Sequence, residues 1–118
     1  MEKDVVIVGA GPAGIFTALE MLRKGSKQSI LLIEKGQPVE KRHCPKAQIG
    51  HCVNCKPYCH ITTGFSGAGA FSDGKLSLSY EVGGDLPTLI GETLAQDTID
   101  YTDKPFNEFS YLPVLLFY

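Results

Sequence analysis

The stretch Val5-Val-Ile-Val-Gly-Ala-Gly-Pro-Ala-Gly14 decides the fold that this sequence predicts. The β-branched run from Asp4 to Val8 is typical of a strand in a parallel sheet, buried on both faces. Pro12 suits the first position of a helix, where its missing N–H does no harm. The stretch therefore predicts a strand, a tight glycine turn and the start of a helix.

The residues that follow extend this pattern to a second strand. Arg23 and Lys24 fall in the last turn of the predicted helix, and Gly25 can end it. Ser29 to Glu34 is another apolar strand, so strand, helix and strand fit into about thirty residues, the size of one βαβ unit. The expected fold class is α/β: a Rossmann-like βαβ FAD/NAD(P)-binding domain, incomplete, with a cysteine-rich loop. The apolar helix residues that share one face at helical spacing are Ile15, Phe16, Leu19 and Leu22.

The glycine turn matches the pattern G-x-G-x-x-G, and its context makes the match specific. Gly9 permits the tight turn out of the strand. Gly11 lacks a side chain, so a pyrophosphate can approach the helix N-terminus, where free N–H groups favour an anion. Gly14 lets the helix pack closely on the strands. Pro12 and Ala13, between these glycines, belong to the same candidate cofactor-binding site.

Glu34 ends the second strand about 20 residues after Gly14, the position of the acidic residue in a dinucleotide-binding unit. Its carboxylate is placed to accept hydrogen bonds from the adenosine ribose hydroxyls. A carboxylate there also disfavours a 2′-phosphate, so NADP is not expected. The alternative is that the glycines merely shape a turn and Glu34 is a surface charge.

The run Val-Ile-Val-Gly-Ala-Gly-Pro-Ala-Gly, with Ile33-Glu34-Lys35-Gly36, resembles the FAD-binding start of the flavoprotein class that includes glutathione reductase-like enzymes. The later segment Gly64–Leu76 is similar to a bacterial and archaeal family of FAD-dependent dehydrogenases, or NAD(P)/FAD-dependent oxidoreductases. The resemblance covers residues 1–104. Family members are several times longer, so it implies an N-terminal fragment that binds FAD and lacks the C-terminal substrate domain.

The resemblance also implies roles for single residues. Lys35 would lie beside the adenosine, and Arg42 would neutralise the pyrophosphate, although a solvated loop cation is an equal alternative. The segment from Gly67 to Gly74 would bring backbone close to the flavin, or else form a flexible hairpin loop. Its candidate contact residues are Gly67, Gly69, Ser72 and Lys75.

Residues 35–63 form the predicted cysteine-rich loop. Its thiols have the spacing C-x7-C-x2-C-x3-C, and the C-x-x-C pair could give two thiolates to one metal. The loop therefore predicts a Zn or Fe–S site, in which His60 could replace the first cysteine. A redox dithiol and unpaired reduced cysteines are the alternatives. The candidate ligands are Cys44, Cys52, Cys55 and Cys59.

The remainder of the chain predicts a strand and a helix. Leu76 to Tyr80 alternates like a half-buried strand. Asp85 is a plausible N-cap for one helix, and residues 105–118 are expected to be an aberrant or truncated apolar tail, or else a packed edge strand. The apolar residues expected on one side of the helix are Leu86, Leu89, Ile90, Leu94 and Tyr101.

Composition limits the possible partners. The 118 residues are 43% hydrophobic and 20% charged, with a formal net charge of −2. Neither nucleic acid nor an acidic membrane is expected as partner. A cytoplasmic location is expected, since no targeting segment is visible.

These observations predict the FAD-binding portion of a flavin-dependent oxidoreductase (dehydrogenase) of unknown substrate. The alternatives are a catalytically inactive truncated fragment, or a metal- or Fe–S-binding module on a Rossmann-like start. No residue qualifies as a specific catalytic acid or base.

Overall fold

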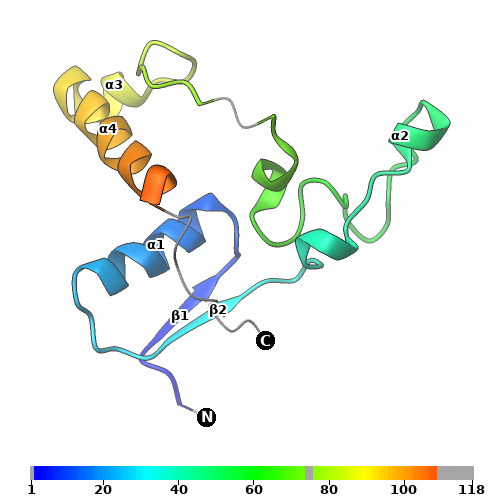
Figure 1. Ribbon diagram of the computed structural model, residues 1–118, viewed down its shortest axis with the longest axis horizontal. Coiled ribbons are helices and arrows are strands. Elements are labelled where there is room, and N and C mark those ends of the chain that lie inside the picture. Colours follow the sequence, from blue (N-terminus) through cyan, green and yellow to red (C-terminus); the bar gives the residue numbers. More distant parts are fainter. Residues whose placement is uncertain (1, 74–75, 109–118) are drawn as a thin grey trace. The chain divides into compact units, whose positions relative to one another are not determined.

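The computed structural model describes residues 2–73 and 76–108. The chain divides after Asp73 into two compact units. Two short 3-10 helices, Val39–Lys41 and Gly67–Phe71, lie in the first unit. The strands and α-helices, labelled in Figure 1, are β1 (Val5–Val8), α1 (Pro12–Arg23), β2 (Ile30–Ile33), α2 (Lys46–Ile49), α3 (Leu86–Ile90) and α4 (Glu92–Glu108).

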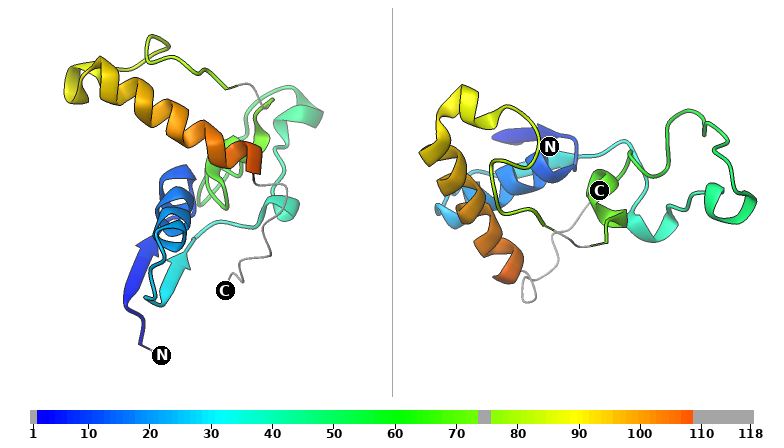
Figure 2. Two further views of the ribbon diagram at one scale, coloured as in Figure 1. Left: turned by 60° about the vertical axis from the view of Figure 1, so that its left-hand side comes forward. Right: turned by 90° about the horizontal axis from the view of Figure 1, so that it is seen from above.

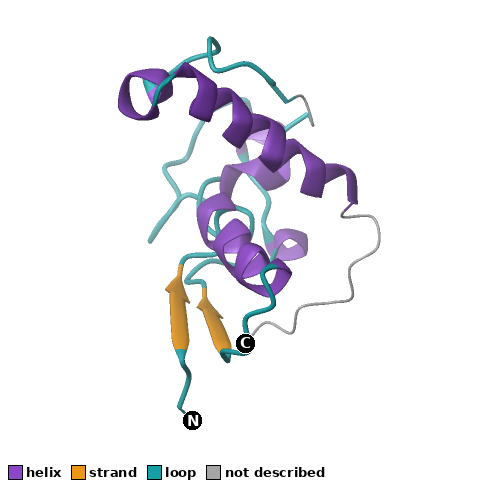
Figure 3. Ribbon diagram, turned by 90° about the vertical axis from the view of Figure 1, so that its left-hand side faces the viewer, coloured by secondary structure: helices purple, strands orange, loops and turns teal. Residues whose placement is uncertain are grey.

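Strands β1 and β2 form a parallel pair, in which Val5 lies opposite Ile30 and Val8 opposite Ile33. The two arrows point the same way in Figure 3. Before the pair begins, the N–H and the hydroxyl of Ser29 both donate to Asp4 Oδ2 at 2.7 Å. The predicted strand, helix and parallel strand are therefore confirmed, and the arrangement is α/β.

Helix α1 has the boundaries that its sequence predicts. Pro12 is its first residue, after the N-cap Gly11. At the other end Gly25 has a φ of +74°, its N–H donates to Leu22 O at 2.9 Å, and the N–H of Ser26 donates to Met21 O at 3.0 Å. This pair of hydrogen bonds is the Schellman motif, which satisfies carbonyl groups at a helix end. Figure 2 shows α1 alongside both strands.

The small core of the first unit lies between α1 and the strands. Ala18 and Leu19 of α1 are buried there, and Ile7 of β1 faces the helix. On the opposite face of β1, Val6 is 51% exposed and Val8 is 83% exposed. The expectation that this strand is buried on both faces is wrong, because one helix covers only one face of a two-stranded sheet.

The second unit corrects two predictions. Leu76 to Tyr80 is irregular rather than a strand, and the carbonyl of Leu78 accepts a hydrogen bond from Gln96 Nε2 of α4 at 3.0 Å. The single predicted helix is two helices, because Gly91, with a φ of +84° and a ψ of 152°, interrupts it between α3 and α4. Asp85 is the N-cap of α3, as predicted, although its side chain makes no capping hydrogen bond.

Helix α4 continues beyond residue 104, where the apolar tail was expected to begin, and ends at Glu108. Residues 109–118 of that tail lie outside the described residues. Among the described helices, none has the length and apolar character needed to cross a membrane.

Candidate functional site

Two of the three glycines in the turn between β1 and α1, Gly9 and Gly14, are required by the local geometry. Gly9 has a φ of +102°, which side-chain-bearing residues rarely adopt, and its N–H donates to Ile33 O at 2.7 Å. A Cβ on Gly14 would collide with the carbonyl oxygen of Gly9 and lie 3.2 Å from Ile7 Cγ2. Gly14 therefore allows α1 to pack against the turn and β1, as the sequence predicts.

Gly11 differs from both, because neither strain nor crowding requires a glycine there. Its φ is −77°, and a Cβ at this position would meet nothing within 4 Å. The open space lies at the N-terminus of the 12-residue helix α1, whose first N–H groups lack intrahelical partners. Such a helix end favours an anion. Binding by Gly9, Gly11, Pro12, Ala13 and Gly14 stays a prediction.

Glu34 follows β2 and reaches the glycine turn. Its Oε2 accepts a hydrogen bond from the N–H of Ala10 at 2.8 Å, and its Oε1 accepts one from the N–H of Gly36 at 2.8 Å. Burial acts to raise the pKa of Glu34, but these N–H groups, that of Lys35 and the charge of Lys35 outweigh it, so the pKa is lowered. The carboxylate is ionised at neutral pH and held by backbone rather than free in solvent.

The segment 61–67 comes to the same place from later in the chain. The N–H of Ser66 donates to Ala10 O at 2.7 Å, and Ser66 has a φ of +65°. A Cβ on Gly67 would lie 3.9 Å from Pro12 Cδ and 4.0 Å from Gly11 Cα. The backbone at Gly67 therefore lies beside the open face of the glycine turn.

Within the described part of the glycine-serine segment, residues 67–71 are helical rather than a hairpin loop. Gly67–Phe71 is a 3-10 helix, and the N–H of Ser72 donates to Gly69 O at 3.2 Å. Gly69 and Ser72 are exposed, and their contacts to a flavin stay predictions. Gly74, the last residue of the predicted segment, and Lys75 lie outside the described residues.

Arg42 is only 5% exposed, so the interpretation as a solvated loop cation is wrong. Its guanidinium lies 4.8 Å from the centroid of the Phe71 ring. Sequence reasoning missed this arrangement, since the hydrogen-bond partners of Arg42 lie 19 to 25 residues away. Those partners are the carbonyl groups of Ile61 (Nη1, 3.3 Å), Thr63 (Nη1, 3.4 Å), Gly67 (Nη1, 3.2 Å) and Phe65 (Nη2).

Lys35 is exposed next to Glu34, and the structure adds Tyr58 beside it. The Tyr58 hydroxyl donates to Lys35 O at 3.0 Å, and Lys35 Nζ lies 5.7 Å from the centroid of the Tyr58 ring. The sequence carried no signal for this aromatic neighbour of the predicted adenosine position.

The predicted metal site is not assembled. In residues 2–73 and 76–108, no group of three or more His, Cys, Asp or Glu side chains is arranged to hold a metal ion. Cys52 and Cys59 are exposed, whereas Cys44 and Cys55 are half-buried, and all four thiols are free. Hydrogen bonds from the backbone of Thr62 and Ile61 lower the pKa of Cys59. Each thiol therefore has its own surroundings instead of one shared centre.

Comparisons with known proteins agree with the position of this site. Residues 4–48 match the family model described as the FAD binding domain. An uncharacterized protein of Clostridium beijerinckii is 42% identical over 72 residues, which is 61% of this chain but only 13% of that relative. No solved structure matches the chain. The matched range 4–48 includes the glycine turn, Glu34 and Arg42, so the resemblance to FAD-dependent oxidoreductases is confirmed for the N-terminal part of the chain.

Proposed function

We propose that this chain carries the FAD-binding portion of a flavin-dependent oxidoreductase, with β1, α1 and β2 as the first unit of a Rossmann-like domain. One observation carries the proposal: the Glu34 carboxylate lies 2.8 Å from the N–H of Ala10, within the glycine turn. Groups suited to a ribose and to a diphosphate therefore converge at the carboxyl ends of two parallel strands, where nucleotides bind in α/β sheets.

The residues present fit the ADP half of FAD. The open face at Gly11 leaves room for a diphosphate against the first turn of α1. A carboxylate offers about four acceptor positions, and the N–H groups of Ala10 and Gly36 use one on each oxygen of Glu34. The positions that remain can accept hydrogen bonds from ribose hydroxyls.

The charge of Glu34 and the family match favour FAD over other nucleotides. An ionised carboxylate repels a 2′-phosphate, which argues against NADP. The match of residues 4–48 and the Gly64–Leu76 segment support FAD over NAD. When bound, FAD supplies an isoalloxazine ring that accepts or donates a hydride. The residues of this chain bind and orient the ADP half, and no catalytic acid or base is assigned to them.

The rest of the activity belongs to the proposal as well. The chain spans 13% of the length of its relative from Clostridium beijerinckii. We expect the substrate domain of a dehydrogenase of this kind to come from the remainder of a longer protein. A cytoplasmic location belongs to the same proposal.

The variant Gly11→Ala tests the function, because its new methyl group meets nothing in the free protein. We expect wild type to bind ADP and FAD in calorimetric titrations. Gly11→Ala should keep the circular dichroism spectrum and melting temperature of wild type, but bind both ligands about tenfold more weakly, a loss of about 1.4 kcal/mol.

Gln28→Ala, an exposed substitution just before β2, is the matched control and should bind like wild type. Unchanged ADP affinity in Gly11→Ala would show that the diphosphate does not lie at this turn. If wild-type protein binds neither ADP nor FAD, the proposed function is wrong.

A further inference from the structure

We propose that Arg42 is a positioning residue, which fixes residues 61–67 against the glycine turn without contacting the bound diphosphate. The role assigned to the fixed segment rests on the proposed function. The claim that Arg42 fixes residues 61–67 concerns the ligand-free protein and can be tested separately.

The guanidinium of Arg42 is already occupied by backbone. Its terminal nitrogens donate to the carbonyl groups of alternate residues along one segment of consecutive turns. Nη1, which carries two N–H groups, lies within hydrogen-bond distance of three carbonyl oxygens, and Nη2 donates to a fourth. The accepting carbonyl groups belong to Ile61, Thr63, Phe65 and Gly67.

The Nε donor of Arg42 is shielded. Nε is buried and has no hydrogen-bond partner in the part of the chain that the structure describes. It faces Gly64, where an added Cβ would lie 2.9 Å from Nε and 2.6 Å from Arg42 Cδ. The Phe71 ring covers another side, with its centroid 4.8 Å from Cζ. No space for a ligand atom remains beside Nε.

The segment that Arg42 holds, residues 61–67, is hydrogen-bonded to the glycine turn. Between the carbonyl groups of Phe65 and Gly67, the N–H of Ser66 donates to Ala10 O at 2.7 Å. The N–H of Phe65 donates to Gln37 O at 3.3 Å, which joins the segment to the chain after β2. Arg42 therefore sets where the backbone of residues 65–67 stands relative to Gly11.

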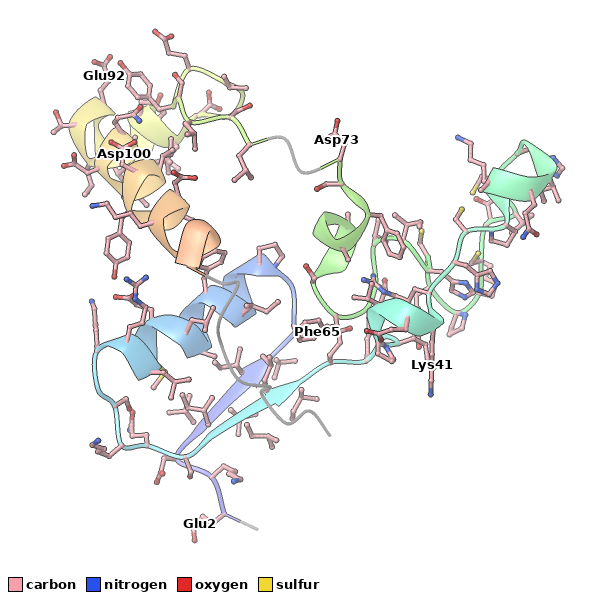
Figure 4. The ribbon with its side chains drawn as sticks, viewed as in Figure 1. Glu2, Lys41, Phe65, Asp73, Glu92 and Asp100 are labelled. Carbon is pink, nitrogen blue, oxygen red and sulfur yellow. The ribbon has the colours of Figure 1, made fainter. Side chains whose placement is uncertain are left out.

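Two substitutions separate the geometry of the fork from its charge. Arg42→Lys keeps the positive charge but loses the planar fork, whereas Arg42→Gln keeps a planar donor group without charge. Lys41→Ala is the matched control, since Lys41 is the exposed preceding cation, and Figure 4 shows its side chain extending away from the ribbon.

The first measurement is amide hydrogen exchange by NMR in the ligand-free full chain. We expect the amides of Phe65 and Ser66 to exchange about tenfold faster in both Arg42 variants, the factor that corresponds to loss of about one net hydrogen bond. The amide of Ile7 in β1 should be unchanged, and so should all three amides in Lys41→Ala. If one Arg42 variant does not fold, the other decides. Loss of protection at Ile7 in both would show a global role and overturn the proposal.

The second measurement compares titrations with ADP and with adenosine. If Arg42 acts through residues 61–67, Arg42→Lys and Arg42→Gln weaken ADP binding by similar factors, because neither restores the fork. A direct contact between Arg42 and the diphosphate predicts unchanged exchange rates at Phe65 and Ser66. It also predicts weaker binding of ADP but not of adenosine, with a smaller loss in Arg42→Lys than in Arg42→Gln. That result would overturn the proposal. Wild-type protein that binds no ADP would refute the proposed function, while the exchange rates would still decide the role of Arg42.

Discussion

At Glu34, one carboxylate joins the glycine turn to the chain that follows β2, since its two oxygens accept the N–H groups of Ala10 and Gly36. The position of Glu34 was predictable, because a residue that ends one of two parallel strands lies at the same sheet edge as the turn after the other strand. Its backbone partners were not, since the sequence suggested only ribose hydroxyls. Arg42 was less predictable still, because carbonyl acceptors exist at every residue and leave no pattern in the sequence.

The lowered pKa of Glu34 predicts a dependence of stability on pH. Because the folded-state pKa lies below the ordinary value of 4.5, the ionised form stabilises the native state. This contribution is complete above pH 4.5 and is lost as pH falls through the folded-state pKa. Glu34→Gln should therefore lower the free energy of unfolding at pH 7, and should flatten its decrease below pH 4.5. Urea unfolding at several pH values measures both effects.

Asp4 supplies the control for that experiment. Hydrogen bonds from the backbone and hydroxyl of Ser29 lower the pKa of Asp4, so this exposed carboxylate also adds to acid sensitivity. Asp4→Asn should leave unchanged the part of the acid-induced loss of stability that is due to Glu34. If Glu34→Gln and wild type lose stability in parallel below pH 4.5, the carboxylate does not hold the turn.

Among the elements, local signals predicted helix ends better than strands. Pro12 and Gly25 mark the ends of α1 because fixed φ and positive φ are backbone properties of single residues. The alternation of Leu76–Tyr80 predicted a strand, but a strand also needs a partner, and the carbonyl of Leu78 instead bonds to Gln96. The single helix predicted after Asp85 runs through Gly91, although Gly91 has a φ of +84° and ends α3 as Gly25 ends α1.

The cap of α1 predicts the effect of Gly25→Ala. An alanine in the left-handed conformation of Gly25, at a φ of +74°, should destabilise the protein by about 1 kcal/mol. A Cβ there would meet nothing within 4 Å, so conformation rather than a clash causes the loss. Urea unfolding gives the change, with the exposed Lys24→Ala as control. Wild-type stability in Gly25→Ala would mean that the helix ends differently in solution.

For the whole molecule, the important property is a sheet with one covered face. The sequence predicted buried strands because a continuous apolar run implies layers on both sides. In this chain the described residues supply α1 for one side, and Val6 and Val8 remain exposed on the other. The sequence pattern therefore shows how apolar β1 is, but it does not show which elements cover each face of the sheet.

The exposed face predicts binding of hydrophobic dyes and self-association. Val8→Thr removes apolar surface from an 83%-exposed position while keeping a β-branched side chain. We expect lower fluorescence of bound anilinonaphthalene sulfonate and less self-association in sedimentation velocity, with stability changed by less than about 0.5 kcal/mol. Val5→Thr, at a half-buried position of the same strand, should instead lower stability. Equal dye binding by Val8→Thr and wild type would contradict this account.

Gly36 and Gly64 touch so closely that a Cβ on Gly36 would overlap the backbone of Gly64, and one on Gly64 would lie 2.5 Å from Gln37 O. When two large side chains pack against each other, a mutation that shortens one can be rescued by a second mutation that lengthens the other. These two residues have no side chain to shorten, so damage at either position has no second-site suppressor at its partner. In a selection for revertants, function should return only through restoration of the original codon or through changes elsewhere in the backbone around the contact.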